Sequence, residues 1–122
     1  MIELVLEIAA RAGSLPSTVQ ALGMVKFRAK MEHACLDCRL YAEVGNPKLL
    51  HYMEQWPTLQ ELESQVRSQR FGMLLSIMET AASPPKLEIR TISEQRDLEF
   101  VSAVRLNLDG TAPVKEEPQL QP

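Results

Sequence analysis

Alternating apolar and polar residues mark four stretches of the chain as strands. The first is IELVLEI at residues 2–8, where four aliphatic side chains share one face and two glutamates share the other. Alternation of this kind is typical of a half-buried strand. It recurs at residues 35–44, 49–56 and 86–93. The turn-forming sequence GNPK at residues 45–48 predicts a hairpin between the second and third strands.

Two other stretches show the three- and four-residue spacing of a helix. Residues 16–32 predict one helix, and a second is expected to begin at about residue 59. Thr58 and Glu61 form the T-x-x-E pattern of a capping box, which marks where that helix begins. Its apolar stripe is interrupted near Ser68 and then resumes. The pattern therefore predicts a break within this helical region.

The order of these elements predicts an α+β fold. It is β-α-β-β-α-β, the ferredoxin-like arrangement with an antiparallel sheet. This domain is expected to span residues 1–93. Residues 94–108 predict a short helix or an irregular arm, and residues 109–122, rich in proline and lacking an apolar period, are expected to be disordered.

Two helices on one face of such a sheet leave the other face bare. We expect Arg39, Tyr41, Glu54 and Arg90 to line this bare face. A sheet of this size is usually covered, and two copies of the chain can cover it symmetrically. The sequence therefore predicts a homodimer.

Composition and charge exclude several classes of protein. The net charge is −3 and the 13 Lys and Arg residues form no basic stripe, so a nucleic-acid partner is not expected. No apolar run approaches the roughly 20 residues of a membrane span. The first basic residue, Arg11, comes too late for a signal peptide. A cytoplasmic location is expected, where Cys35 and Cys38 would stay reduced.

Three segments resemble the antibiotic biosynthesis monooxygenase family, also called the quinol monooxygenase family. EQWPTLQELESQVRSQRF at 54–71 resembles its E-x-W-x-(S/T)-x-x-x-L segment and the following helix that ends in S-x-x-F. CLDCRLY at 35–41 resembles its second strand, and residues 73–93 resemble its passage from helix to last strand. The resemblance covers residues 1–93. It implies a dimeric α+β barrel that oxygenates quinol or polyphenol rings without metal or flavin, so no cofactor is expected.

The chain departs from this family at two positions of the second helical region. Family members commonly carry histidines there, in an E-A-H-x-x-S-x-H-F setting, whereas this chain has Gln65 and Arg70. A group that handles protons is lost at both. Two functions stay open: a cofactor-independent monooxygenase that acts on a quinol or other aromatic substrate with O₂, and a non-catalytic module that binds a small ligand or a partner.

His51 and Tyr41 are the expected catalytic residues. A cofactor-free oxygenase must accept a proton from a phenolic substrate, and histidine titrates in the right range. Tyr41 shares a predicted strand face with Arg39, and the two could stabilise a phenolate or bind a quinol oxygen. They could equally anchor a dimer interface, and His51 could be a surface histidine.

Trp56, Gln65 and Phe71 complete the expected substrate-binding set with Arg39. The Trp56 indole could form the wall of a pocket, or it could pack the third strand against the following helix. Gln65 could bind a ligand by hydrogen bonds, and Phe71 is the phenylalanine of the S-x-x-F motif. Cys35 and Cys38 form C-x-x-C on a predicted strand, where they point to opposite faces, so no metal or dithiol site is expected.

Overall fold

The computed structural model describes residues 1–107 and contains a four-stranded antiparallel sheet. Its strands are β1 (Ile2–Ala9), β2 (Asp37–Glu43), β3 (Asn46–Trp56) and β4 (Lys86–Thr91). Their order in the sheet is β2-β3-β1-β4, with every neighbouring pair antiparallel. The first and last strands of the chain thus lie side by side, and the predicted α+β ferredoxin-like fold is confirmed.

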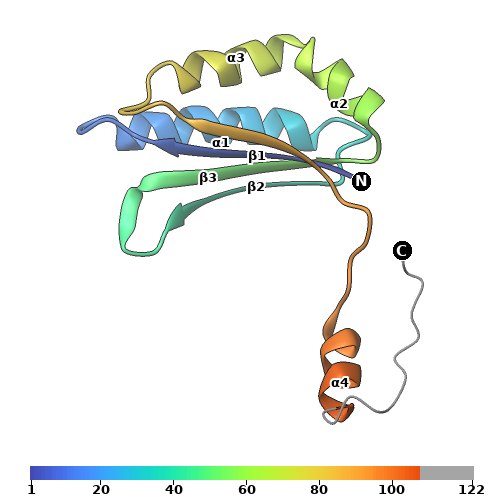
Figure 1. Ribbon diagram of the computed structural model, residues 1–122. Coiled ribbons are helices and arrows are strands. Elements are labelled where there is room, and N and C mark those ends of the chain that lie inside the picture. Colours follow the sequence, from blue (N-terminus) through green and yellow to red (C-terminus); the bar gives the residue numbers. More distant parts are fainter. Residues whose placement is uncertain (108–122) are drawn as a thin grey trace. The chain divides into compact units, whose positions relative to one another are not determined.

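Three helices cover one face of this sheet. They are α1 (Leu15–Lys30), α2 (Leu59–Val66) and α3 (Gln69–Met78), and they lie together on the same side in Figure 1. Burial along β1 alternates strictly, because every second side chain points towards the helices. The core between the two layers is closed by aliphatic side chains that are at most 1% exposed: Leu4, Leu6, Ile8, Leu22, Val25 and Leu74.

The second helical region is split into α2 and α3, as the interrupted stripe predicted. The Thr58 hydroxyl accepts a hydrogen bond from the Glu61 backbone N–H at 3.2 Å and begins α2. The Ser68 hydroxyl does the same for the Phe71 N–H, also at 3.2 Å, and begins α3. Each serine or threonine satisfies a donor that the helix itself leaves unpaired. The sequence therefore contains two helix starts.

The turn between β2 and β3 is shorter than predicted. GNPK was expected to form the turn, but β3 already begins at Asn46, so Val44 and Gly45 connect the strands. Gly45 has φ +89°, a left-handed conformation that glycine adopts at little cost. The register shifts between Ala42, which pairs with Leu50, and Glu43, which pairs with Asn46, so residues 47–49 lie at the irregularity. Proline cannot donate to the sheet, and this irregular pairing allows Pro47 to lie at the second position of β3.

The opposite face of the sheet carries no helix from residues 1–92 (Figure 1). Along β3 the side chains at Leu49, His51, Met53 and Gln55 point to this face and are partly buried. We call this surface the bare face.

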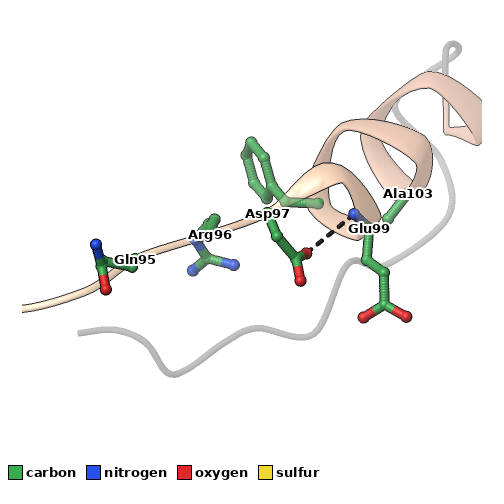
Figure 2. Close-up of a pocket in the computed structure, with 6 residues that line it drawn as sticks. Gln95, Arg96, Asp97, Glu99 and Ala103 are labelled. Atoms are coloured by element: carbon green, nitrogen blue, oxygen red, sulfur yellow. Dashed lines mark hydrogen bonds between the residues drawn. The ribbon is translucent and has the colours of Figure 1, made fainter.

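Residues 1–92 form one compact unit, and a second unit begins at Ser93. The second unit contains α4 (Leu98–Leu106), none of whose residues is buried. Asp97 caps this helix by accepting the Glu99 backbone N–H at 3.0 Å, as Figure 2 shows. The expected disordered tail, residues 109–122, lies outside the described residues. Across residues 1–107, no helix combines the length and apolar character needed to cross a membrane.

Candidate functional site

A buried carboxylate, Glu54, lies between the sheet and the helices. Its side chain is fully buried on the helix-facing side of β3. The Tyr52 hydroxyl donates to Oε2 at 2.5 Å, and the Trp56 indole N–H donates to Oε1 at 3.0 Å. The period of a strand places all three residues on one face. Glu54 was expected on the bare face, and that expectation is wrong.

Arg70 neutralises this carboxylate. Its Nη1 donates to Glu54 Oε2 at 2.6 Å, its Nη2 lies 3.4 Å from Oε1, and its side chain is only 6% exposed. The guanidinium carbon is also 6.0 Å from the centre of the Trp56 ring, within range of a cation–π contact. A charge buried this deeply needs a partner and complete hydrogen bonding. Here both oxygens of Glu54 are engaged.

Gln65 links the buried pair to the surface. Arg70 Nη2 donates to Gln65 Oε1 at 2.8 Å, and Gln65 Nε2 donates to Glu32 Oε1 at 3.1 Å. Gln65 is buried at the end of α2, whereas Glu32 is exposed just after α1. The break at Ser68 separates the two helices that supply Gln65 and Arg70. We refer to Tyr52, Glu54, Trp56, Gln65 and Arg70 together as the Glu54 cluster.

Burial shifts the pKa of several groups in and beside this cluster. It raises the pKa of the Cys38 thiol to about 12, although a hydrogen bond with Tyr52 at 3.4 Å works in the opposite direction. Burial and then the charge of Glu54 raise the pKa of Tyr52. Desolvation alone would lower the pKa of Arg70, but its hydrogen bond and attraction to Glu54 raise it overall. Tyr52 and Cys38 thus stay protonated, and Arg70 stays charged, at neutral pH.

A hollow of about 390 Å³ opens beside the exposed end of this chain of hydrogen bonds. We call it the α1–α3 hollow. Gln65 and Arg70 are its innermost polar groups, and Glu32 supplies its exposed carboxylate. Its full lining is Arg28, Met31, Glu32, Gln65, Ser68 and Arg70. The hollow therefore offers N–H donors, one hydroxyl and one carboxylate to a small polar molecule.

The sheet divides the predicted site residues into two groups. Trp56, Gln65 and Phe71 lie on the helix side, where Trp56 is fully buried and Phe71 is 6% exposed. His51 and Tyr41 lie on the bare face with their rings stacked 5.2 Å apart at an interplanar angle of 13°. The structure brings each group together, but it does not bring the two groups to one site.

His51 lies between two carboxylates on the bare face. Its Nε2 is 2.7 Å from Glu43 Oε1, and its Nδ1 is 3.8 Å from Glu7 Oε2. A second hollow, of about 140 Å³, lies beside it. The lining of that hollow is Val5, Glu7, His51, Lys86, Glu88 and Arg90. This site is rich in charge but offers little room for an aromatic ring.

Arg39 forms an ion pair with a residue of its own strand. Its Nε donates to Asp37 Oδ2 at 2.7 Å, and this hydrogen bond is the main reason that the pKa of Asp37 is lowered. Arg39 is exposed, so it is free to meet a partner surface as well. Cys35 and Cys38 are both free thiols, and residues 1–107 contain no group of three or more residues that could hold a metal ion.

Sequence reasoning missed Glu54, Tyr52, Arg70 and Glu32 as parts of one network. One signal was available: in the sequence LLHYMEQW, Glu54 shares a strand face with Leu50, Tyr52 and Trp56. A lone acid on such a face predicts a buried, paired carboxylate. Its cationic partner lies 16 positions further along the chain and has no local sequence signal.

The second unit has a hollow of its own, on the first turn of α4. Figure 2 shows Arg96 on the extended segment before α4, Asp97 at its N-cap and Glu99 in its first turn. The Arg96 guanidinium lies 4.9 Å from the centre of the Phe100 ring, a cation–π contact. These residues are exposed, and the hollow lacks a buried polar group that could orient a ligand.

Solved structures share this fold. An antibiotic biosynthesis monooxygenase matches with a TM-score of 0.69 and 13% identity, over 77% of this chain and all (100%) of that one. A candidate antibiotic biosynthesis monooxygenase from Deinococcus radiodurans matches with a TM-score of 0.73 and 14% identity, over 80% and 97% of the two chains. A conserved protein from Methanosarcina mazei Go1 matches with a TM-score of 0.67 and 20% identity, over 73% of this chain and 89% of that one.

The resemblance seen in the sequence thus extends to the fold. The chain spans nearly the whole length of these structures. No protein-family model matches the sequence, and no curated protein matches it.

Proposed function

We propose that this protein is a homodimeric monooxygenase that acts on a quinol-like aromatic molecule with O₂, without metal or flavin. The observation that carries the proposal is the α1–α3 hollow, in which a carboxylate and buried N–H donors meet on a fold shared with antibiotic biosynthesis monooxygenases. A hydroxylated ring needs both kinds of group. One accepts its proton, and the others stabilise the anion that remains.

The hollow supplies these roles from three residues. Glu32 is the proposed base, because it is the carboxylate in the hollow and its Oε1 already accepts a hydrogen bond from Gln65 at 3.1 Å. Gln65 and Arg70 are the proposed donors to the phenolate oxygen. Met31 offers an apolar surface to the ring. Glu54 holds Arg70 in place and does not itself touch the substrate in this proposal.

The reaction needs only the substrate and O₂. Glu32 takes the phenolic proton, and the phenolate passes one electron to O₂, which gives an aryloxyl radical and superoxide. These combine to form a carbon–oxygen bond. The O–O bond of the resulting peroxide then breaks, so that one oxygen stays on the ring as a carbonyl. The other leaves as water with the two hydrogens that the substrate loses.

Oxygen uptake with a panel of dihydroxy-aromatic compounds tests this proposal. Glu32→Gln should lower turnover by about 10²–10⁴-fold, the usual loss on removal of a general base, with little change in binding. His51→Gln is the matched variant on the bare face and should turn over normally. If His51→Gln lowers turnover and Glu32→Gln does not, the reaction takes place at His51 and Tyr41 on the bare face instead.

The second candidate function is a non-catalytic ligand-binding or interaction module. It is favoured by two features of the Glu54 cluster. Both carboxylate oxygens of Glu54 already accept hydrogen bonds from within the protein, and Trp56 is fully buried. This candidate predicts binding of an aromatic compound with no oxygen uptake by any member of the panel. Calorimetry beside the oxygen electrode separates the two functions.

A further inference from the structure

A hollow of about 360 Å³ lies between the first turn of α1 and the end of α3. We call it the Thr18 hollow. In Figure 1 the start of α1 and the end of α3 lie at the same end of the helix layer. The residues of its lining that carry a hydroxyl group are Ser14, Ser17, Thr18, Ser76 and Thr80, and no lining residue is acidic. The hollow is therefore rich in groups that form hydrogen bonds.

The Thr18 hydroxyl is buried at this hollow without a hydrogen-bond partner. Thr18 is only 7% exposed, and its side chain forms no hydrogen bond within residues 1–107. A threonine in a helix commonly donates to the carbonyl four positions earlier. That carbonyl, of Ser14, already accepts the Thr18 N–H and the Ser17 hydroxyl, each at 2.9 Å. Both of its lone pairs are taken, so the Thr18 hydroxyl needs a partner in the hollow.

The first turn of α1 contains two more unpaired donors. No side chain caps this helix. Within residues 1–107 the N–H groups of Leu15 and Ser17 have no acceptor, and Pro16 has no N–H. No acidic side chain lies in this turn, so none neutralises the positive end of the helix dipole there. Free N–H groups at the start of a helix favour an anion.

The α3 side of the hollow offers acceptors instead. The Ser76 hydroxyl donates to the Gly72 carbonyl at 3.1 Å, and the Thr80 hydroxyl donates to the Ile77 carbonyl at 2.7 Å. Each hydroxyl has one proton, so its oxygen can only accept a further hydrogen bond. A ligand in the hollow thus meets donors from α1 and acceptors from α3.

A cation lies at the edge of the hollow. Arg11 Nε donates to the backbone carbonyl of Thr80 at 3.0 Å. Arg11 forms no ion pair with an acid within the part of the chain that the structure describes. Its charge is therefore not cancelled by a neighbouring carboxylate, and it adds to the positive end of α1.

We propose that the Thr18 hollow binds an oxyanion that carries a proton, of which hydrogen phosphate is the simplest. The Thr18 hydroxyl and the Ser17 N–H donate to its oxygens, and its own O–H donates to the Ser76 or Thr80 hydroxyl. A carboxylate or sulfate ion has no proton for that last bond near neutral pH. This site is distinct from the α1–α3 hollow, which lies at the other end of α1, so it does not depend on oxygenase activity.

Titration of the full-length protein with inorganic phosphate, followed by nuclear magnetic resonance at constant ionic strength, tests this site. The amide signals at the start of α1 should shift and reach saturation, and sulfate should bind more weakly. Thr18→Val keeps the shape of the side chain and removes its hydroxyl. It should weaken phosphate binding by about tenfold, because a hydrogen bond to a charged group is lost.

Thr91→Val is the matched control. Thr91 is exposed and pairs with Ile2, at the opposite end of β1 from the start of α1. This variant should bind phosphate as the wild type does. Thr18→Val should also melt no lower than the wild type in phosphate-free buffer, because it removes a buried hydroxyl that has no partner.

Four outcomes would overturn the proposal. The first is that phosphate causes no saturable shift, which means that only water fills the hollow. The second is that sulfate binds as tightly as phosphate, which excludes a role for the ligand's proton. The third is that Thr18→Val binds phosphate as tightly as Thr91→Val. The fourth is a lower melting temperature of Thr18→Val without phosphate, which means that the hydroxyl has a partner inside the protein.

Discussion

Gln65 and Arg70 are joined by a hydrogen bond of 2.8 Å, from Arg70 Nη2 to Gln65 Oε1. These are the two positions at which the family that the chain resembles commonly carries histidines. Here Arg70 binds a buried carboxylate, because its Nη1 also donates to Glu54 Oε2 at 2.6 Å. A permanently charged guanidinium and a neutral amide cannot exchange protons near neutral pH. Proton transfer on the helix side therefore depends on another group, and Glu32 is the carboxylate that lines the hollow.

Arg70→Met should strongly destabilise the fold. The substitution keeps the side-chain volume roughly constant but leaves the Glu54 carboxylate buried without its cation. Removing one partner of a buried ion pair typically costs about 3–5 kcal/mol. Urea denaturation measures this loss. Adding Glu54→Gln to the Arg70→Met variant should recover part of it, and a double variant as unstable as the single one would contradict this account.

Trp56→Phe should lower stability by about 1–3 kcal/mol, the usual cost of leaving a buried polar group unpaired. The indole N–H donates to Glu54, and the ring is fully buried. Thermal unfolding provides the measurement. Tyr41→Phe is the control, because Tyr41 is 56% exposed and its substitution should change stability by less than about 0.5 kcal/mol. Equal effects of the two would mean that the hydrogen bond to Glu54 contributes little.

Stability should fall as the pH rises from about 9 towards 12. The Cys38 thiol has an ordinary pKa of 9.0, and burial raises it to about 12 in the folded state. Between these values the unfolded chain releases the proton while the folded chain keeps it, so rising pH favours unfolding. Urea midpoints measured across this range test the direction. Cys38→Ala should make the urea midpoint depend less on pH in this range. If the dependence is unchanged in that variant, other groups such as Tyr52 cause the loss of stability.

The bare face should mediate the proposed homodimer. Val5 is half-buried near its centre on β1, so Val5→Lys should place an unpaired cation in the interface and shift the protein towards monomer. Light scattering at micromolar concentration follows this change. Val44→Lys is the matched control, because Val44 lies in the β2–β3 turn and is 98% exposed. A wild-type mass near 13.7 kDa would contradict the homodimer.

Local patterns in the sequence determined the elements of the fold. Alternation placed β1 and β4, and the Thr58 hydroxyl forms the cap that its T-x-x-E pattern predicted. These features depend on residues within a few positions of one another, so they can be read without knowledge of the rest of the chain. The turn predicted at GNPK is shorter than expected for a non-local reason, because the shifted pairing of β2 with β3 allows Asn46 and Pro47 to belong to β3.

Only the tertiary structure decided which predicted site residues act together. A period of two shows that Tyr52, Glu54 and Trp56 share a face, but it does not show which face the helices cover. Packing of α1, α2 and α3 buried that face and left His51 and Tyr41 on the other. Glu54 can be buried because Arg70 reaches it from a different helix. The sequence contains both charges, and only the fold brings them within 2.6 Å of each other.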